Sequence, residues 1–242
     1  WKLFLDLGFS FIIIFWVSRL FKFLSVLLIS SYRADGHELV RDKGELGMIF
    51  LNALFSVGTP FFFFLAIAYT KVSNAYFIQY TMSAWVLLVA VLFLGEKATG
   101  RKILGFLLTI AGILLIARPE ELLGLNLGIV FALLSALAYT GDIITAFRLK
   151  AYSYHTVSVY TNAMQFLITT AMLPFFFKDI SSVQGEPMGF AGLVVIGIIL
   201  GIASDLYYQA LHVLEASVAA VIAHLELLFA CVFAFLLFSE SP

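Results

Sequence analysis

Charged residues are scarce in this chain of 242 residues. Asp, Glu, Lys and Arg make up 12% of it, against about 25% in an average soluble domain. Hydrophobic residues make up 62%, and the mean hydropathy is +1.05. The apolar residues come in blocks of roughly twenty, the length of a helix that crosses a bilayer. The composition therefore excludes a water-soluble fold and predicts an all-α, polytopic membrane protein.

The sequence also lacks the features of several other classes of protein. The single cysteine, Cys231, lies in an apolar run, so a disulfide framework is excluded. The formal net charge is −1 and there is no basic tract, which argues against nucleic acid as a partner. Phosphate-binding glycine loops, nucleophile motifs and metal ligands at i, i+4 spacing are also missing. We therefore expect no enzyme, no cofactor and no metal, but a protein whose partners are the lipid bilayer and a small-molecule substrate.

The hydropathy pattern predicts eight transmembrane helices. Very short polar links, such as 71–74 and 212–216, make the flanking helices antiparallel neighbours. The helices at 74–94 and 217–238 are expected to be uninterrupted. The predicted ranges are 9–31, 45–69, 74–94, 101–117, 122–146, 154–177, 188–211 and 217–238.

Lys and Arg residues predict the orientation. Eight of them fall in one set of alternate loops (Arg33, Arg41, Lys43, Lys97, Arg101, Lys102, Arg148, Lys150), and four in the other (Lys2, Lys71, Arg118, Lys178). By the positive-inside rule, the loops 32–45, 95–102 and 147–155 are cytoplasmic. The expected location is the plasma membrane.

The second half of the chain repeats the first, 144 residues on. Ala66 matches Ala210, Ser73 matches Ser217, and Glu96 matches Glu240. We therefore expect two repeats, 1–119 and 120–242. The helix 122–146 has no counterpart before residue 1, and 101–117 has none after residue 242. The parent protein should then have ten helices, and this chain lacks the first and the last. Because each repeat has five helices, the two copies must be inverted, as in many transporters.

Polar residues inside the predicted helices are the candidate site, since a buried ionisable group costs about 2.5–3.5 kcal/mol on insertion scales. Several of them form stripes at helical spacing. Such stripes either line a wet cavity or hydrogen-bond helix to helix, and the acids among them favour a cavity. The ionisable residues are Arg19, Lys22, Asp142, Asp205, His224 and Glu226, and the amides are Asn52, Gln79, Asn162, Gln165 and Gln209. The stripes are Tyr76/Gln79/Tyr80/Ser83, Asp205/Tyr208/Gln209/His212, Ser135/Tyr139/Asp142 and Asn52/Ser56/Thr59.

Some polar and small residues have plainer interpretations. Arg19 and Lys22 would snorkel or form an ion pair. His224 and Glu226 are two residues apart, so at most one of them faces a cavity. Glu96 and Glu240 end equivalent helices at opposite faces and are expected to be structural or gating residues. The pairs Gly124/Gly128 and Gly197/Gly201 predict close helix contacts.

The segments 66–80 and 89–117 resemble the EamA branch of the drug/metabolite transporter superfamily. The likeness lies mainly in the run Leu-Phe-Leu-Gly-Glu-Lys-Ala-Thr-Gly-Arg-Lys that starts at Leu92, and in the Gly-Ile-Leu that follows at 112–114. Segment 210–240 is similar, with Ser239 where a Gly is common, and Arg19 falls where the family often has an Arg. The resemblance implies two inverted five-helix repeats around a central cavity. It also implies transport of small metabolites or amphipathic compounds, often export of amino acids or their analogues. The cavity-lining residues that it implies are Asn52, Gln79, Tyr80, Asp142, Asp205, Gln209, His224 and Glu226, and the stripe of Asp142 adds Tyr139 to the candidates.

The sequence thus predicts a transporter that works by alternating access. Asp142 and Asp205 would bind a cationic group with help from Tyr80 and Gln209, and either Asp could carry a coupling proton. A channel is one alternative. An intramembrane aspartyl protease is disfavoured, because Tyr139 replaces the first glycine of the Gly-x-Gly-Asp motif.

Overall fold

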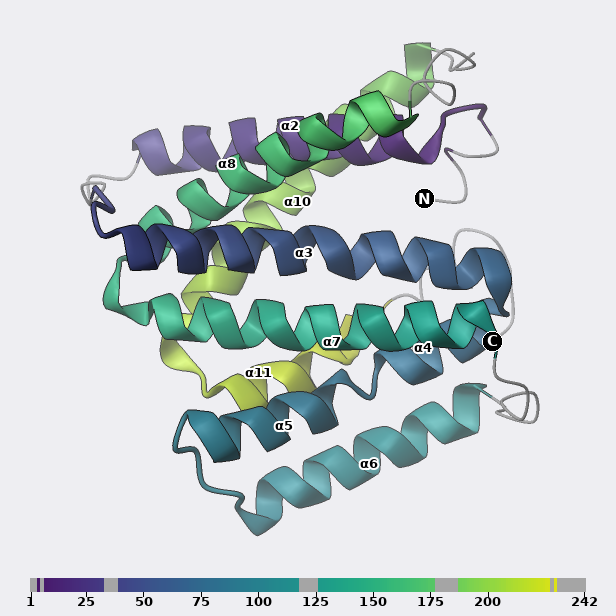
Figure 1. The fold of residues 1–242 in the computed structure, drawn as a ribbon, viewed down its shortest axis with the longest axis vertical. Helices are drawn as coiled ribbons and strands as arrows, with labels where there is room; N and C mark the ends of the chain where they lie inside the picture. The colour runs from purple at the N-terminus through teal and green to yellow at the C-terminus, as the bar shows by residue number, and fades with distance from the viewer. Residues whose placement is uncertain are drawn as a thin grey trace. The chain divides into compact units, whose positions relative to one another are not determined.

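The computed structural model describes residues 4, 7–32, 39–117, 126–176, 187–226 and 229, and these residues form helices with no strand among them (Figure 1). This confirms the all-α fold class. The elements are α2 (Phe11–Tyr32), α3 (Lys43–Tyr69), α4 (Val72–Gln79), α5 (Met82–Phe93), α6 (Gly100–Ala117), α7 (Leu127–Arg148), η2 (Leu149–Ala151), α8 (Tyr154–Met172), η3 (Leu173–Phe176), α10 (Pro187–Val213) and α11 (Ala216–Ala223).

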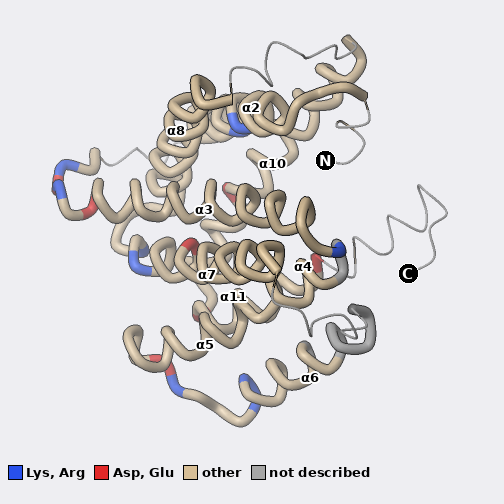
Figure 2. Tube along the Cα trace, turned by 45° about the vertical axis from the view of Figure 1, so that its right-hand side comes forward, with Lys and Arg blue, Asp and Glu red and all other residues tan. Residues whose placement is uncertain are grey.

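Five segments of the described chain are long and apolar enough to cross a membrane. They are Phe11–Tyr32, Lys43–Tyr69, Asn74–Phe93, Leu127–Ala151 and Pro187–Val213. Helix α8 has 19 residues but is not among them, because polar side chains interrupt its apolar sequence. Charged residues lie mostly near helix ends, and few occur along the helices (Figure 2). The protein is a polytopic membrane protein.

Two of the predicted helices are not continuous, so that prediction was wrong. The helix expected at 74–94 is interrupted between α4 and α5, at Tyr80 and Thr81, and the helix expected at 217–238 is interrupted at His224, the C-cap of α11; residues 227, 228 and 230–238 lie outside the described part of the chain. At the first break, the Thr81 N–H and the Thr81 hydroxyl both donate to the Ile78 carbonyl, at 3.1 and 2.6 Å. A threonine hydroxyl that bonds the backbone in this way competes with the helical ladder. Apolar periodicity alone does not reveal such a break.

The internal repeat is visible in the helix bounds. Moving the bounds of α3 forward by 144 residues gives those of α10, and the same shift converts α4 into α11. The shift also brings α2 onto the span covered by α8 and η3, to within one residue at the N-terminal end. The two breaks obey the same rule, since Tyr80 and His224 are 144 residues apart. The chain is built as an inverted repeat of membrane-spanning helices.

The chain forms two compact units, and each combines segments from both repeats. Unit 1 comprises Trp1–Val57 and Arg148–His212, and unit 2 comprises Gly58–Phe147 and Val213–Pro242. In unit 1, the equivalent helices α2 and α8 pack against each other. In unit 2, α11 packs against α5 and α6, and α6 also contacts α4. The boundary expected at residues 119 and 120 lies outside the described residues and stays a prediction.

Side-chain caps and one glycine turn fix the helix ends. The side chains of Asp42, Asn126 and Ser153 each accept a hydrogen bond from the backbone N–H three residues later, as N-cap residues do. Gly95 has a φ of +70°, and beyond it the Glu96 N–H donates to the Ala90 carbonyl at 3.2 Å. The left-handed conformation of Gly95, which glycine adopts easily, turns the chain so that the Ala90 carbonyl accepts from both the Leu94 and the Glu96 N–H. It explains physically why the Gly-Glu pair stands at this point.

Small residues allow close helix contacts, as predicted for Gly197 and Gly201. A Cβ on Gly201 would lie 2.6 Å from Ser25 Cβ, and one on Gly197 would lie 2.6 Å from Phe21 Cβ, so α10 approaches α2 closely in unit 1. In unit 2, a Cβ on Gly128 would lie 2.6 Å from Thr70 Cβ. Gly124 lies outside the described residues.

Candidate functional site

Helix α8 presents a buried polar face to the interior of unit 1. Its buried polar residues recur at helical spacing over most of its length, so one side of the helix is polar and the other apolar. This face was not among the predicted stripes, although its period is visible in the sequence. It consists of His155, Thr156, Ser158, Thr161, Asn162, Gln165 and Thr169.

Two cations of α2 end on this face. Arg19 Nη1 and Lys22 Nζ both donate to Gln165 Oε1, at 2.6 and 3.1 Å. The Gln165 amide in turn donates to Ser56 Oγ at 3.0 Å. Arg19 also donates to the Ser56 carbonyl at 3.3 Å. Pro60 has no N–H, so that carbonyl lacks its usual helical donor four residues on. Arg19 and Lys22 thus share the oxygen of one buried amide, and the expected snorkelling or ion pair stays a prediction.

Further along unit 1, Asp205 faces His155. Asp205 is 3% exposed and His155 is 2% exposed, and Oδ1 lies 3.2 Å from Nδ1. One turn away, the Tyr208 hydroxyl donates to Asn52 Oδ1 at 2.9 Å. Gln209 is exposed, so it does not share the buried side of α10 with Asp205 and Tyr208. The predicted residues Asn52 and Asp205 therefore each have a buried polar partner in unit 1, and the partner of Asp205 is the unpredicted His155.

Three buried polar atoms of α8 have no hydrogen-bond partner among the described residues. They are Ser158 Oγ, Thr161 Oγ1 and Asn162 Oδ1. The Asn162 amide group is used, since it donates to the Ser158 carbonyl and to Ser204 Oγ. Buried acceptors and hydroxyls of this kind require a polar partner, such as water or a polar solute.

In unit 2, the predicted polar residues also bond across helices. The Gln79 amide donates to Ser135 Oγ at 3.2 Å, and the Ser135 hydroxyl donates to the Thr59 carbonyl at 2.8 Å. Asp142 is 7% exposed, and Tyr139, three residues earlier on α7, is half-buried. Several stripes therefore make helix-to-helix hydrogen bonds, and a wet cavity along them stays a prediction.

The two helix breaks of unit 2 meet each other. His224 Nε2 lies 3.0 Å from the Tyr80 carbonyl oxygen, and the two rings are 4.8 Å apart between centroids. His224 is half-buried while Glu226 is exposed, as expected for residues two apart on a helix.

Glu96 ties the loop between α5 and α6 to the start of α11. Its side chain is 6% exposed and accepts hydrogen bonds from the Ala216 N–H at 2.8 Å and from the Ser217 hydroxyl. Lys102 bridges Glu96 at 2.9 Å and Glu215 at 2.5 Å. Burial raises the pKa of Glu96, but the hydrogen bonds from Ser217, Lys102 and Ala216 outweigh it and hold this pKa below its usual value. The carboxylate acts as a cap of α11. Its predicted counterpart, Glu240, lies outside the described residues.

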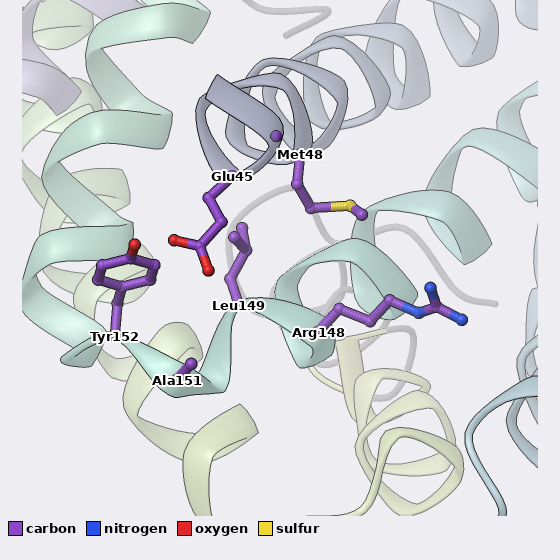
Figure 3. Close-up of a pocket in the computed structure, with 7 residues that line it drawn as sticks. Glu45, Met48, Arg148, Leu149, Ala151 and Tyr152 are labelled. Carbon is purple, nitrogen blue, oxygen red and sulfur yellow. The ribbon is translucent and has the colours of Figure 1, made fainter. Parts of the chain in front are cut away.

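A pocket of about 330 Å³ lies elsewhere in unit 1, at the start of α3 and the turn before α8 (Figure 3). It is lined by Gly44, Glu45, Met48, Arg148, Leu149, Ala151 and Tyr152, none of which is a predicted site residue. Within the described part of the chain, no three His, Cys, Asp or Glu side chains gather as metal ligands would.

Sequence reasoning missed His155, Ser158 and Thr161. Their signal was the helical spacing of polar residues along 155–169, which could have been found by the same count that identified the other stripes. It also missed Lys102 and Glu215 as partners in the Glu96 cluster. Lys102 lies only six residues after Glu96, but the contact of Lys102 with Glu215 joins residues more than a hundred positions apart, so spacing could not reveal the cluster.

Comparisons with known proteins agree with this architecture. No curated protein matches the chain. A solved crystal structure of a protein with 15% sequence identity superposes with a TM-score of 0.79, over 96% of this chain and 81% of that one, which shows the fold alone. The model of the EamA-like transporter family matches residues 2–118 and again 126–242. With both matches together covering nearly the whole sequence, and with two sets of helices related by a shift of 144 residues, the chain belongs to the EamA-like transporter family.

Proposed function

We propose that the protein exports a small metabolite or amphipathic compound, such as an amino acid or an analogue, across the plasma membrane by alternating access. The observation that carries this proposal is the pair of helix breaks at Tyr80 and His224, at equivalent points of the two repeats. Interrupted helices in corresponding positions of inverted repeats mark the substrate and ion sites of many transporters.

Buried acids support a substrate with a cationic or amine group. Asp142 in unit 2 and Asp205 in unit 1 are each less than a tenth exposed, and a carboxylate in a membrane needs a functional or structural reason. In this proposal the two carboxylates bind the substrate amine during the cycle. Asn52, Gln79, Tyr80, Tyr139, Gln209, His224 and Glu226 supply further polar contacts.

Other residues have supporting roles in the proposal. The loops 32–45, 95–102 and 147–155 face the cytoplasm, as their Lys and Arg content suggests. Arg19, Glu96 and Glu240 act as structural or gating residues. The contacts of Glu96 with Ala216, Ser217 and Lys102 support that role, because they join two loops of unit 2.

The test is transport by the purified protein in proteoliposomes, with a panel of labelled amino acids and organic amines as probes. We expect saturable flux that is accelerated by unlabelled compound on the opposite side. The double variant Asp142→Asn, Asp205→Asn should transport at least about tenfold more slowly. Each substitution removes more than one charge-assisted contact between a carboxylate and the substrate amine.

Asp42→Asn is the matched control, because Asp42 is an exposed N-cap of α3. It should transport as the wild type does. Normal transport by the double variant would contradict the assigned roles of the two acids. Ohmic, non-saturable current would replace the carrier mechanism with a channel.

A further inference from the structure

The break between α4 and α5 changes what the Tyr80 carbonyl can bind. In a continuous helix, this oxygen would accept from the Ala84 N–H. Here the Ala84 N–H donates to the Thr81 carbonyl instead, at 2.9 Å. The Tyr80 oxygen accepts from the Ser83 hydroxyl at 3.3 Å and lies 3.0 Å from His224 Nε2. The break therefore provides a backbone acceptor for a side chain of the other repeat.

The second ring nitrogen of His224 also faces a carbonyl. Nδ1 lies 2.8 Å from the Ala220 carbonyl oxygen, one turn earlier on α11. A carbonyl oxygen can only accept a hydrogen bond, and a neutral imidazole has one N–H and one acceptor nitrogen. Both contacts can be hydrogen bonds at once only when both ring nitrogens carry a proton.

We propose that His224 is a proton-binding site, in which the carbonyls of Ala220 and Tyr80 hold a doubly protonated, positively charged ring. Tyr80 is the C-cap of α4, and Ala220 lies in the last turn of α11. The C-terminal end of a helix carries partial negative charge and stabilises a cation. Two helix ends thus converge on one ring, and they come from equivalent places in the two repeats.

Titratable groups near the ring come from several elements. Glu226 follows two residues on and is exposed, whereas His224 is half-buried. Tyr76 stacks on Tyr80 at 5.7 Å. Of the two helices packed on α11, α5 has no acid or base among its described residues, and α6 contributes Arg101 and Lys102 at its start. Lys102 is paired there with Glu96 and Glu215, at the opposite end of α11.

The proton site deepens the proposed function and rests on it for its role. The ring takes one proton from water and returns it to water, so one proton moves per cycle if the two faces differ in access. In the neutral ring, one nitrogen lone pair would face a carbonyl oxygen, which is repulsive. Loss of the proton therefore favours separation of the two breaks, and gain of the proton favours their contact.

The direct test is nitrogen NMR of protein labelled with ¹⁵N-histidine and reconstituted in liposomes at pH 7. The chain has four histidines, and the resonance absent from His224→Gln identifies the site. We expect both ring nitrogens of His224 to give the imidazolium signature. A spectrum with one protonated and one bare nitrogen would overturn the proposal.

Matched variants complete the test. His212→Gln, a half-buried histidine near the end of α10 in unit 1, should leave the His224 signal unchanged. If His224→Gln does not fold, a chain that keeps His224 as its single histidine gives the same assignment. A neutral ring in a protein that transports would overturn the proton site alone. A doubly protonated His224 ring in a protein that does not transport would support the proton site and contradict the proposed function.

Discussion

In unit 1 the half-buried Arg19 and the buried Lys22 donate to a side-chain oxygen, that of Gln165, whereas in unit 2 the ring of His224 lies between two backbone carbonyls. Both units are built from equivalent helices of the two repeats, yet they satisfy polar groups differently. In unit 1, α2 and α8 are continuous helices, and the oxygen shared by the two cations belongs to a side-chain amide, although Arg19 also donates to the Ser56 carbonyl that Pro60 leaves without a helical donor. In unit 2, the helix breaks release backbone groups.

The comparison also indicates which property each unit controls: stability in unit 1, and protonation and transport in unit 2. A network of side chains between continuous helices fixes their packing, because each contact depends on a particular pair of residues. A contact between two helix breaks can open without loss of either helix. We therefore expect substitutions in unit 1 to change stability most, and substitutions at the breaks of unit 2 to change protonation and transport.

The largest effect is expected for Gln165→Leu in unit 1. The substitution removes the oxygen that accepts from both Arg19 and Lys22 and should lower the free energy of unfolding by about 3 kcal/mol, since hydrogen bonds to charged groups are each worth about 1.5–3 kcal/mol. Thermal unfolding of the purified protein in detergent measures it. Gln209→Leu is the matched control, because Gln209 is exposed on α10 of the same unit, and it should be nearly neutral. Equal effects of the two variants would refute the proposed importance of the Gln165 oxygen.

Replacing a glycine at a close helix contact by alanine should lower the stability by a smaller amount, in both units. Gly201→Ala in unit 1 and Gly128→Ala in unit 2 would each place a methyl group within 3 Å of a neighbouring helix or loop residue. Overpacking of this kind costs about 1–3 kcal/mol. Gly105→Ala is the control, because a Cβ there meets only Val221 Cγ1, at 4.0 Å. Melting temperatures of the three variants test this, and loss of stability by Gly105→Ala alone would contradict it.

Glu96→Gln should give the smallest effect, about 1–2 kcal/mol, because it weakens a helix cap and an ion pair while keeping the side-chain shape. The pKa of Glu96 is lowered in the folded protein, so the charged carboxylate stabilises the fold above the usual value of 4.5. This contribution is lost as the pH falls through the lower, folded-state pKa.

The free energy of unfolding of the wild type and of Glu96→Gln, measured at pH 7 and in steps below pH 4.5, checks the direction of this pH dependence. The wild type should be more stable at pH 7, and the difference should shrink on acidification. Glu45→Gln serves as the control, because Glu45 Oε2 has no hydrogen-bond partner among the described residues. A difference that grows towards low pH would contradict the assigned direction.

Much of this protein follows from its sequence alone. Low charge and long apolar blocks determine that it lies in a membrane, and the match of Ser73 with Ser217 and of Glu96 with Glu240 reveals the repeat. These properties depend on composition and on spacing along the chain, which the sequence states directly.

Only the tertiary structure decided which groups meet. Asp205 faces His155, Glu96 caps α11, and the Tyr80 carbonyl meets His224. The sequence predicted continuous helices at the two breaks, because an apolar run has the same hydropathy whether or not a turn interrupts it, as the Thr81 hydroxyl bonded to the Ile78 carbonyl does at the first break. Partners of buried polar groups depend on the packing of distant segments, and no periodicity within one helix records that packing.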